Sequence, residues 1–196
     1  SLVENNTPLQ SYHGYTSTDL YAIDPRFGTT ALYERLVTEA HHRGLKVIMD
    51  HVCNHVSIDH PWIRNLPVPG WLNGTVARHQ RTYHYKSGAT DIHSDSTVRE
   101  NTVRGWFADY MPDLNQANPF VSRYLMQNTI WWIETTGLDG IREDTFPYLD
   151  EKFQSEWCTA VLTEYPGFTI VGEVWINDPA YLAAYQRGTP LHRAIP

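Results

Sequence analysis

Two acidic residues, Asp144 and Glu173, each end a short apolar run that follows a segment of helical periodicity. In a parallel β/α arrangement, both acids would therefore reach the carboxyl edge of one sheet, where such folds place their chemistry. Two facing carboxyl groups can hydrolyse a glycosidic bond, because one acts as nucleophile or base and the other donates a proton. The sequence predicts a pair of catalytic acids.

Arg142 lies two residues before Asp144, so both side chains point to the same face of the predicted strand. Its positive charge is expected to keep Asp144 ionised and aligned, which favours Asp144 as the nucleophile. Glu173 would then be the general acid, with a pKa raised by Val171, Trp175 and the Asp144 carboxylate. The alternative for these residues alone is a structural ion pair at a strand end.

Asp50 and His55 close the preceding apolar run by the same geometry, and the imidazole is placed to hydrogen-bond a sugar hydroxyl. His51 and His55, spaced by four residues beside Asp50, also invite a zinc interpretation. The H-E-x-x-H arrangement, however, needs a helix and an intervening Glu, whereas this segment leaves a strand. We therefore expect no zinc here.

Apolar spacing predicts three helices and three short strands in alternation, which is typical of a parallel sheet. The predicted helices cover residues 30–43, 118–137 and 152–165, and the strands cover 45–50, 140–145 and 168–174. Residues 1–29, rich in Gly, Pro, Tyr and Ser, indicate a long loop. The predicted fold class is α/β, as part of a (β/α)8 barrel, because three strands cannot close one. A doubly wound sheet is the alternative, although no Gly-rich phosphate loop follows any strand.

Residues 56–112 interrupt this alternation with polar, Pro- and Gly-punctuated, aromatic-rich sequence, which indicates an inserted subdomain. The predicted organisation has three parts. Residues 1–55 hold a loop, a helix and a strand, residues 56–112 are the insertion, and residues 113–196 hold two further helix–strand pairs and the loop that follows.

Bulk composition is that of an ordinary globular chain, with 196 residues, 41% hydrophobic and 19% charged. A formal charge of −7 without a Lys/Arg cluster argues against a nucleic-acid partner. No apolar run is long enough for a membrane span, and two cysteines do not make a disulfide framework. The aromatic content of 13% fits either sugar stacking or an aromatic core. A start without Met suggests a piece of a longer protein, so extracytoplasmic and cytoplasmic locations both stay open.

Several blocks, in sequence order, resemble those of the α-amylase clan, glycoside hydrolase family 13. The matching blocks are Gly14-Tyr15 with Asp19-Leu20-Tyr21, Asp50-His51-Val52-Cys53-Asn54-His55, Met111-Pro112-Asp113-Leu114-Asn115, Gly140-Ile141-Arg142-Glu143-Asp144 and Gly172-Glu173-Val174-Trp175. The resemblance implies a partial TIM barrel, from about strand 2/3 to strand 5, with an inserted domain B at residues 56–112.

The resemblance also implies roles for individual residues. Asp144 would be the nucleophile, Glu173 the acid/base and Arg142 the aligning residue. The implied substrate-binding residues are Tyr15, by stacking, and His55, both at subsite −1, together with Asp50 at the floor of the site, Trp175 and Tyr148. No cofactor is required, but the position of Asn54 binds calcium in some members, so calcium stays open.

The implied activity is retaining hydrolysis of α-1,4, and in some members α-1,6, glucosidic bonds in maltodextrins, cyclodextrins or pullulan. The blocks look like the neopullulanase, cyclomaltodextrinase and maltogenic-amylase branch, and a homodimer of the full-length protein stays open. Thr145-Phe146-Pro147-Tyr148 and Ile176 depart from that branch, which leaves bond preference open. The block that carries the third catalytic acid is absent before Pro196, so we expect the isolated segment to be nearly inert. The alternatives are a transglycosylase and a non-catalytic binding or transporter subunit.

Overall fold

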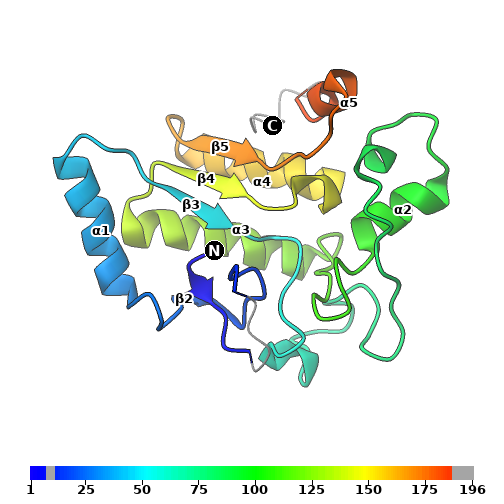
Figure 1. Ribbon diagram of the computed structural model, residues 1–196, viewed down its shortest axis with the longest axis horizontal. Helices are drawn as coiled ribbons and strands as arrows, with labels where there is room; N and C mark the ends of the chain where they lie inside the picture. The colour runs from blue at the N-terminus through cyan, green and yellow to red at the C-terminus, as the bar shows by residue number, and fades with distance from the viewer. Residues whose placement is uncertain (8–11, 187–196) are drawn as a thin grey trace.

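A three-stranded parallel sheet forms the centre of the computed structural model, which describes residues 1–7 and 12–186. Its strands are β3 (Ile48–His51), β4 (Gly140–Glu143) and β5 (Thr169–Gly172), in that order. Helix α3 (Pro119–Thr136) connects β3 to β4 and helix α4 (Glu151–Glu164) connects β4 to β5, and both lie on one face of the sheet (Figure 1). The predicted alternation of parallel strands and helices is confirmed.

The helices begin and end where the sequence carries capping residues. Asn118 accepts a hydrogen bond from the Phe120 amide at the start of α3, with Pro119 at the first helical position. Gly137 ends α3 in the left-handed conformation, at a φ of 71°, which glycine adopts without a steric penalty. Helix α1 (Thr30–His42) starts in the same way, because the Thr29 side chain accepts from the Leu32 amide.

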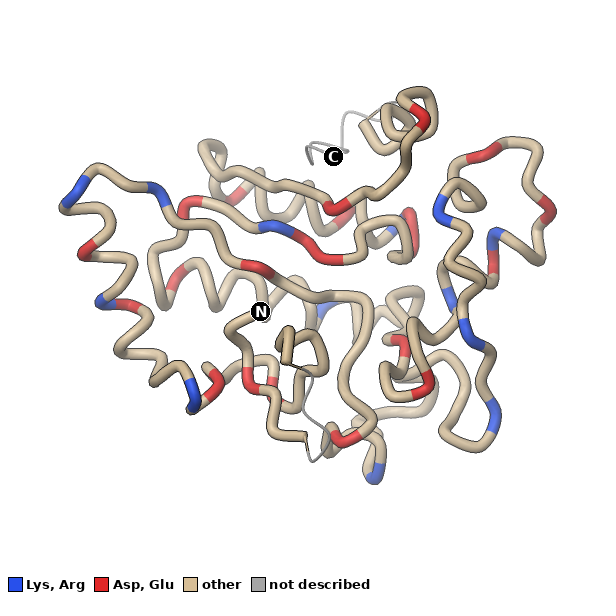
Figure 2. Tube along the Cα trace, viewed as in Figure 1, with Lys and Arg blue, Asp and Glu red and all other residues tan. Residues whose placement is uncertain are grey.

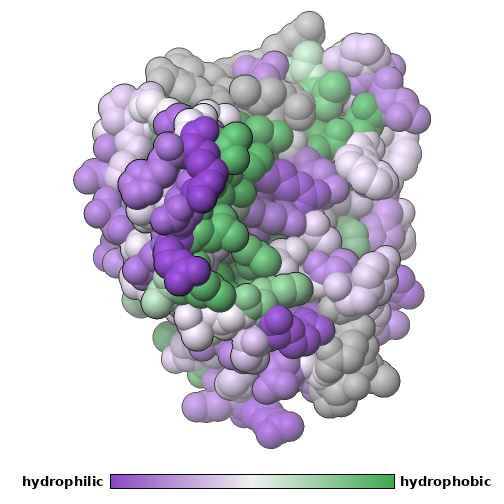
Figure 3. Space-filling view, turned by 60° about the vertical axis from the view of Figure 1, so that its left-hand side comes forward, coloured by the Kyte–Doolittle hydropathy of each residue, from purple (hydrophilic) through white to green (hydrophobic). Residues whose placement is uncertain are grey.

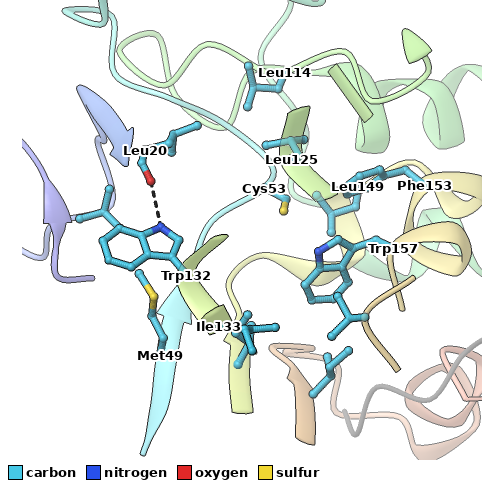
Figure 4. Packing of buried hydrophobic residues seen from close by; sticks show 14 of the residues in the cluster. Leu20, Met49, Cys53, Leu114, Leu125, Trp132, Ile133, Leu149, Phe153 and Trp157 are labelled. Carbon is cyan, nitrogen blue, oxygen red and sulfur yellow. Dashed lines mark hydrogen bonds between the residues drawn. The ribbon is translucent and has the colours of Figure 1, made fainter. Parts of the chain in front are cut away.

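Two buried indoles fill the space between the sheet and its helices. Trp132 of α3 and Trp157 of α4 are fully buried, and both keep a hydrogen bond for the indole N–H. Trp132 Nε1 donates to the Leu20 carbonyl over 2.9 Å (Figure 4), and Trp157 Nε1 donates to Thr129 Oγ1 over 2.8 Å. Much of the aromatic content is therefore core.

Residues 1–7 and 12–29 contain more regular structure than the sequence predicts. Strands β1 (Val3–Glu4) and β2 (Asp19–Ile23) pair antiparallel, and Val3, Leu20 and Ile23 are buried. The long-loop prediction was wrong here, because these short strands are held by core contacts rather than by a periodic pattern.

The segment between β3 and α3 contains short elements joined by isolated bridges. These elements are the 3-10 helices η1 (Pro61–Ile63) and η2 (Lys86–Ala89), and helix α2 (Ser96–Arg104). Bridges link His55 to Asp113 and Leu72 to Leu114, so the two ends of the segment lie side by side beyond β3. Whether this segment is a separate domain stays a prediction.

Two further short elements are η3 (Phe146–Tyr148), after β4, and α5 (Pro179–Ala184), after β5. Residues 187–196 of the third predicted part lie outside the described residues.

An apolar band is exposed along α1 and the start of β3. Leu32, Leu36, Leu45 and Ile48 are each about half exposed, and Figure 3 shows apolar side chains gathered along this side of the molecule. Tyr33 and Val37 are the buried residues of α1. A parallel strand normally has both faces and both edges covered by other parts of the protein. An exposed apolar band beside β3 is therefore typical of a surface that packs against further structure.

No helix within residues 1–7 and 12–186 is both long and apolar enough to cross a membrane.

Candidate active site

The carboxyl ends of the three strands open into a cavity of about 510 Å³. Figure 2 shows acidic positions near these strand ends and a basic position within the middle strand. Asp144 and Glu173 both line the cavity, as the sequence predicts. The cavity wall also includes Tyr15, His55, Tyr148 and Trp175, which are four of the five predicted substrate-binding residues.

Arg142 links the acids of all three strands. Its Nη1 donates to Asp50 Oδ1 over 2.5 Å and to Asp144 Oδ1 over 2.9 Å, and its Nη2 lies 2.6 Å from Glu173 Oε1. The register pairs Asp50 with Arg142 and so sets them side by side on one face of the sheet. One guanidinium thus holds three carboxylates, which is more than the Arg142–Asp144 pair that the sequence predicts.

The surroundings of Asp144 act on its pKa in opposite directions. Burial and the nearby Glu173 carboxylate outweigh the effect of Arg142 and raise the pKa of Asp144 to about 7. This shift is opposite in direction to the one expected from Arg142 alone, because Asp144 is only 5% exposed and lies near Glu173. The hydrogen bond from Arg142 aligns the Asp144 carboxyl, and the role of Asp144 as nucleophile stays a prediction.

Glu173 is held by the backbone of the neighbouring strand. The Glu173 amide donates to the Glu143 carbonyl over 2.9 Å, and the Thr145 amide donates to Glu173 Oε2 over 3.0 Å. Thr145 reaches this position at a φ of 50°, which is strained for a β-branched residue and costs of order 1–3 kcal/mol. Backbone strain of this kind is common at functional sites, where surrounding contacts maintain it.

Hydrogen bonds through Tyr15 connect Asp50 to His55 beside the acids. The Tyr15 hydroxyl donates to Asp50 Oδ2 over 2.7 Å. Asp50 does not line the cavity, and its place at the floor of the site stays a prediction. His55 Nε2 donates to the Tyr15 carbonyl over 3.1 Å, and Asn54 Nδ2 donates to His55 Nδ1 over 3.2 Å. Burial lowers the pKa of His55 to about 4, so the imidazole is neutral near pH 7. Both ring nitrogens have protein partners here, and a hydrogen bond from His55 to sugar stays a prediction.

The opposite wall of the cavity comes from the segment between β3 and α3, which the sequence reasoning left without named site residues. His84 Nδ1 lies 3.2 Å from the Tyr148 hydroxyl, and Phe107 stacks on His55 with ring centroids 5.4 Å apart. Lys86 Nζ lies 5.2 Å from the centroid of the Trp175 ring, which is 74% exposed. The aromatic and histidine content of residues 79–107 was the available signal, but it did not indicate which side chains face the acids.

Several buried side-chain oxygens near the site lack hydrogen-bond partners among the described residues, and two of them lie on segments that pair with each other. These two are Asn54 Oδ1 and Asp113 Oδ1, from segments joined by the His55–Asp113 bridge. Burial raises the pKa of Asp113 well above its ordinary value. Buried carboxylate and amide oxygens without donors are the ligand type that Ca²⁺ prefers, so these residues fit the calcium that the resemblance leaves open. The buried group of His51, Cys53 and Glu143 also gathers metal-ligand atoms, but these side chains already bond to one another.

Residues 5–195 match the family described as alpha amylase, catalytic domain. The chain belongs to the α-amylase family. Among relatives of this family, an intracellular maltogenic amylase of Bacillus subtilis is 34% identical over 185 residues, covering 94% of this chain. Neopullulanase 2 of Thermoactinomyces vulgaris is 32% identical over 176 residues, covering 90% of it.

A solved α-amylase of Geobacillus thermoleovorans, complexed with acarbose, superimposes with a TM-score of 0.79 at 34% identity. The match covers 96% of this chain and 39% of that structure. The chain spans about 29% of the length of the Bacillus and Thermoactinomyces relatives. The predicted family is therefore confirmed, and the chain corresponds to part of its catalytic domain.

Proposed function

We propose that this chain is the central part of a retaining α-glucan hydrolase that cleaves α-1,4, and in some substrates α-1,6, glucosidic bonds. The observation that carries the proposal is a single guanidinium, that of Arg142, in contact with both Asp144 and Glu173, which line one cavity. Retaining enzymes hold their two carboxyl groups about 5–5.5 Å apart, and a shared arginine supports so short a separation.

In the proposed reaction Asp144 attacks the anomeric carbon while Glu173 protonates the leaving oxygen. Glu173 then accepts a proton from the water that hydrolyses the covalent intermediate. Only the ionised form of Asp144 can attack, so its raised pKa predicts that activity rises with pH through about 7. Arg142 keeps the two carboxyl groups aligned, and Asp50 holds Arg142 and the Tyr15 hydroxyl.

Substrates are proposed from the relatives and from the walls of the cavity. The solved relative binds acarbose, and the curated relatives are named for maltogenic amylase and neopullulanase activity. Tyr15, Tyr148 and the exposed Trp175 give the cavity aromatic faces on which pyranose rings can stack. We propose maltodextrins, cyclodextrins and pullulan as the substrate class.

We further propose that the chain works within a complete (β/α)8 barrel in which residues 56–112 are the inserted domain B. The exposed apolar band on α1 and the paired ends of the 56–112 segment support this arrangement. A third catalytic acid would come from a strand outside these 196 residues. A crystal structure of the complete protein tests both points, and an α1 face left open to solvent would contradict the barrel.

The test of the activity uses the complete protein and its Asp144→Asn and Glu173→Gln variants. We expect each variant to lose at least about 1,000-fold in maltodextrin hydrolysis, because each removes one of two acids that act together. Asp139→Asn, at the opposite end of the same strands, is the control and should keep its activity. Unchanged hydrolysis in either active-site variant would overturn the assignment.

Transfer to a sugar acceptor is the second candidate, because the exposed indole of Trp175 offers a surface for an acceptor beside Glu173. Product analysis with high concentrations of maltotriose separates the two. Products longer than the substrate indicate transglycosylation, and glucose and maltose alone indicate hydrolysis.

We also propose that Asn54 and Asp113 would hold a calcium ion that fastens the 56–112 segment to the end of β3. If so, a chelator should lower the melting temperature of the complete protein, and added calcium should restore it. The Asp113→Asn variant should melt at the same temperature with and without the chelator. If the chelator does not change the melting temperature of the unsubstituted protein, the calcium site is refuted.

A further inference from the structure

An ionisable pair lies fully buried behind the candidate active site. His51 of β3 and Glu143 of β4 are partners in the strand register, and their side chains are at most 3% exposed. His51 Nδ1 lies 2.7 Å from Glu143 Oε2. Burying two ionisable groups costs desolvation free energy that an apolar pair would avoid, so a gain in stability is a poor explanation for them.

Hydrogen bonds connect this pair to the residues that follow β3 and, through Asn128, to α3 and β2. Glu143 Oε1 accepts the Cys53 amide over 2.7 Å, so the carboxylate bridges β4 to the first residues beyond β3. Asn128 Nδ2 donates to the Leu20 carbonyl over 2.8 Å, which leaves its Oδ1 to accept from His51 Nε2 over 3.2 Å. The pair is therefore tied to α3 and to β2 as well as to both strands.

The surroundings of the pair leave little room for movement. Trp157 lies parallel to the His51 ring with centroids 6.3 Å apart, and Figure 4 shows Cys53 and Trp157 within the apolar cluster. Burial alone would lower the pKa of His51, but the Glu143 carboxylate outweighs it and the net pKa is raised. Burial also raises the pKa of Glu143. A proton is thus retained between the two side chains, and their hydrogen bond persists.

The backbone of the same two residues holds both candidate catalytic acids. The His51 carbonyl accepts the Asp144 amide over 2.8 Å, and the Glu143 carbonyl accepts the Glu173 amide over 2.9 Å. A shift of β3 against β4 at this end would break the Asp144–His51 hydrogen bond, so the Asp144 backbone would lose its hold on β3 and could move relative to Glu173. Displacements of about 1 Å can cost a catalytic site about 100-fold in rate.

We propose that His51 and Glu143 are positioning residues that lock the carboxyl ends of β3 and β4 and thereby set the relative placement of Asp144 and Glu173. This inference rests on the proposed hydrolase function. It adds to that function two residues that touch neither the cavity nor a substrate.

Asp139, at the amino ends of β3 and β4, provides a control position for this proposal. Asp139, just before β4, accepts the Val47 amide over 2.8 Å and pairs with Lys46 and His41 at 2.7 Å each. A carboxylate thus bridges the strands at both ends, but only the Glu143 end adjoins the catalytic acids. Asp139→Asn should lower thermal stability without changing the turnover of the folded enzyme.

The experiment compares three variants of the complete protein with the unsubstituted enzyme, well below their melting temperatures. The double variant His51→Leu with Glu143→Leu replaces the pair by apolar side chains, and we expect its kcat to fall about 10- to 100-fold with KM changed less than about 3-fold. Glu143→Gln keeps an acceptor for the Cys53 amide and a donor for His51, so it should retain most of the kcat. A purely structural role would change the melting temperature of these variants but not their kcat.

Amide hydrogen exchange gives a second measurement that does not need activity. Exchange at Cys53 and Asp144 should accelerate in the double leucine variant and stay unchanged in Asp139→Asn. Normal kcat or normal exchange in the double variant would overturn the positioning role while leaving the hydrolase proposal intact. An unsubstituted protein that fails to hydrolyse maltodextrin would instead refute the proposed function, and the exchange measurement would still decide whether the pair locks the strand ends.

Discussion

Replacing Asp144 by Asn should stabilise the folded protein at alkaline pH while abolishing its activity. Asp144 is buried beside Glu173, and its pKa is raised from 3.8 to about 7. For a carboxyl group with a raised folded-state pKa, the folded state binds the proton more tightly than the unfolded chain does. The protein therefore loses stability as pH rises from about 4 through about 7, and Asn removes that loss.

The magnitude follows from the two pKa values. The interval between 3.8 and about 7 corresponds to about 4 kcal/mol, at about 1.4 kcal/mol for each pH unit. The effect of the hydrogen bond from Arg142, which is 2.9 Å long, is already contained in this interval, because Arg142 lowers the raised pKa of Asp144. We therefore expect a gain of up to about 4 kcal/mol in the free energy of unfolding above about pH 8.

Urea unfolding of the complete protein and its Asp144→Asn variant, at about pH 5 and about pH 8, measures this gain. The free energy of unfolding of the variant should rise relative to that of the unsubstituted protein by about 2–3 kcal/mol between these pH values. Glu156→Gln, on the exposed side of α4, is the control and should show no such pH dependence. A difference that stays constant with pH, or that favours the unsubstituted protein more at about pH 8, would refute the reasoning.

Two further predictions concern residues around the acids. Arg142→Lys should lower kcat about 100-fold or more, because a single ammonium cannot reproduce contacts with Asp50, Asp144 and Glu173 together, and steady-state kinetics on maltodextrin would show it. Trp175→Ala should raise KM for long maltodextrins about 10-fold with little change in kcat, since the exposed indole offers about 1–2 kcal/mol of stacking away from the reacting bond. An equal loss on maltotriose and on long chains would contradict that role for Trp175.

Local sequence patterns predicted most of the regular structure, and they predicted that Asp144 and Glu173 lie at one edge of the sheet. The helices 118–137 and 152–165 have clear apolar spacing and capping residues, and the structure places them at Pro119–Thr136 and Glu151–Glu164. The short strands β1 and β2 have no such pattern, because Val3, Leu20 and Ile23 are buried by contacts distant in sequence. Periodicity reports which face of an element is buried, but only when the element is long enough to repeat.

The residue types and their spacing determined that two acids and one arginine reach the same edge of a parallel sheet, because strand direction and side-chain alternation are local properties. Only the tertiary structure decided which of these side chains contact one another and how burial shifts their pKa values. Arg142 contacts three acids rather than one, and burial leaves Asp144 with a pKa of about 7. The sequence also did not predict the His51–Glu143 pair, since an acid on a strand can face either solvent or the core. Charge state and hydrogen-bond partners depend on distances and burial across the fold, and no local pattern contains them.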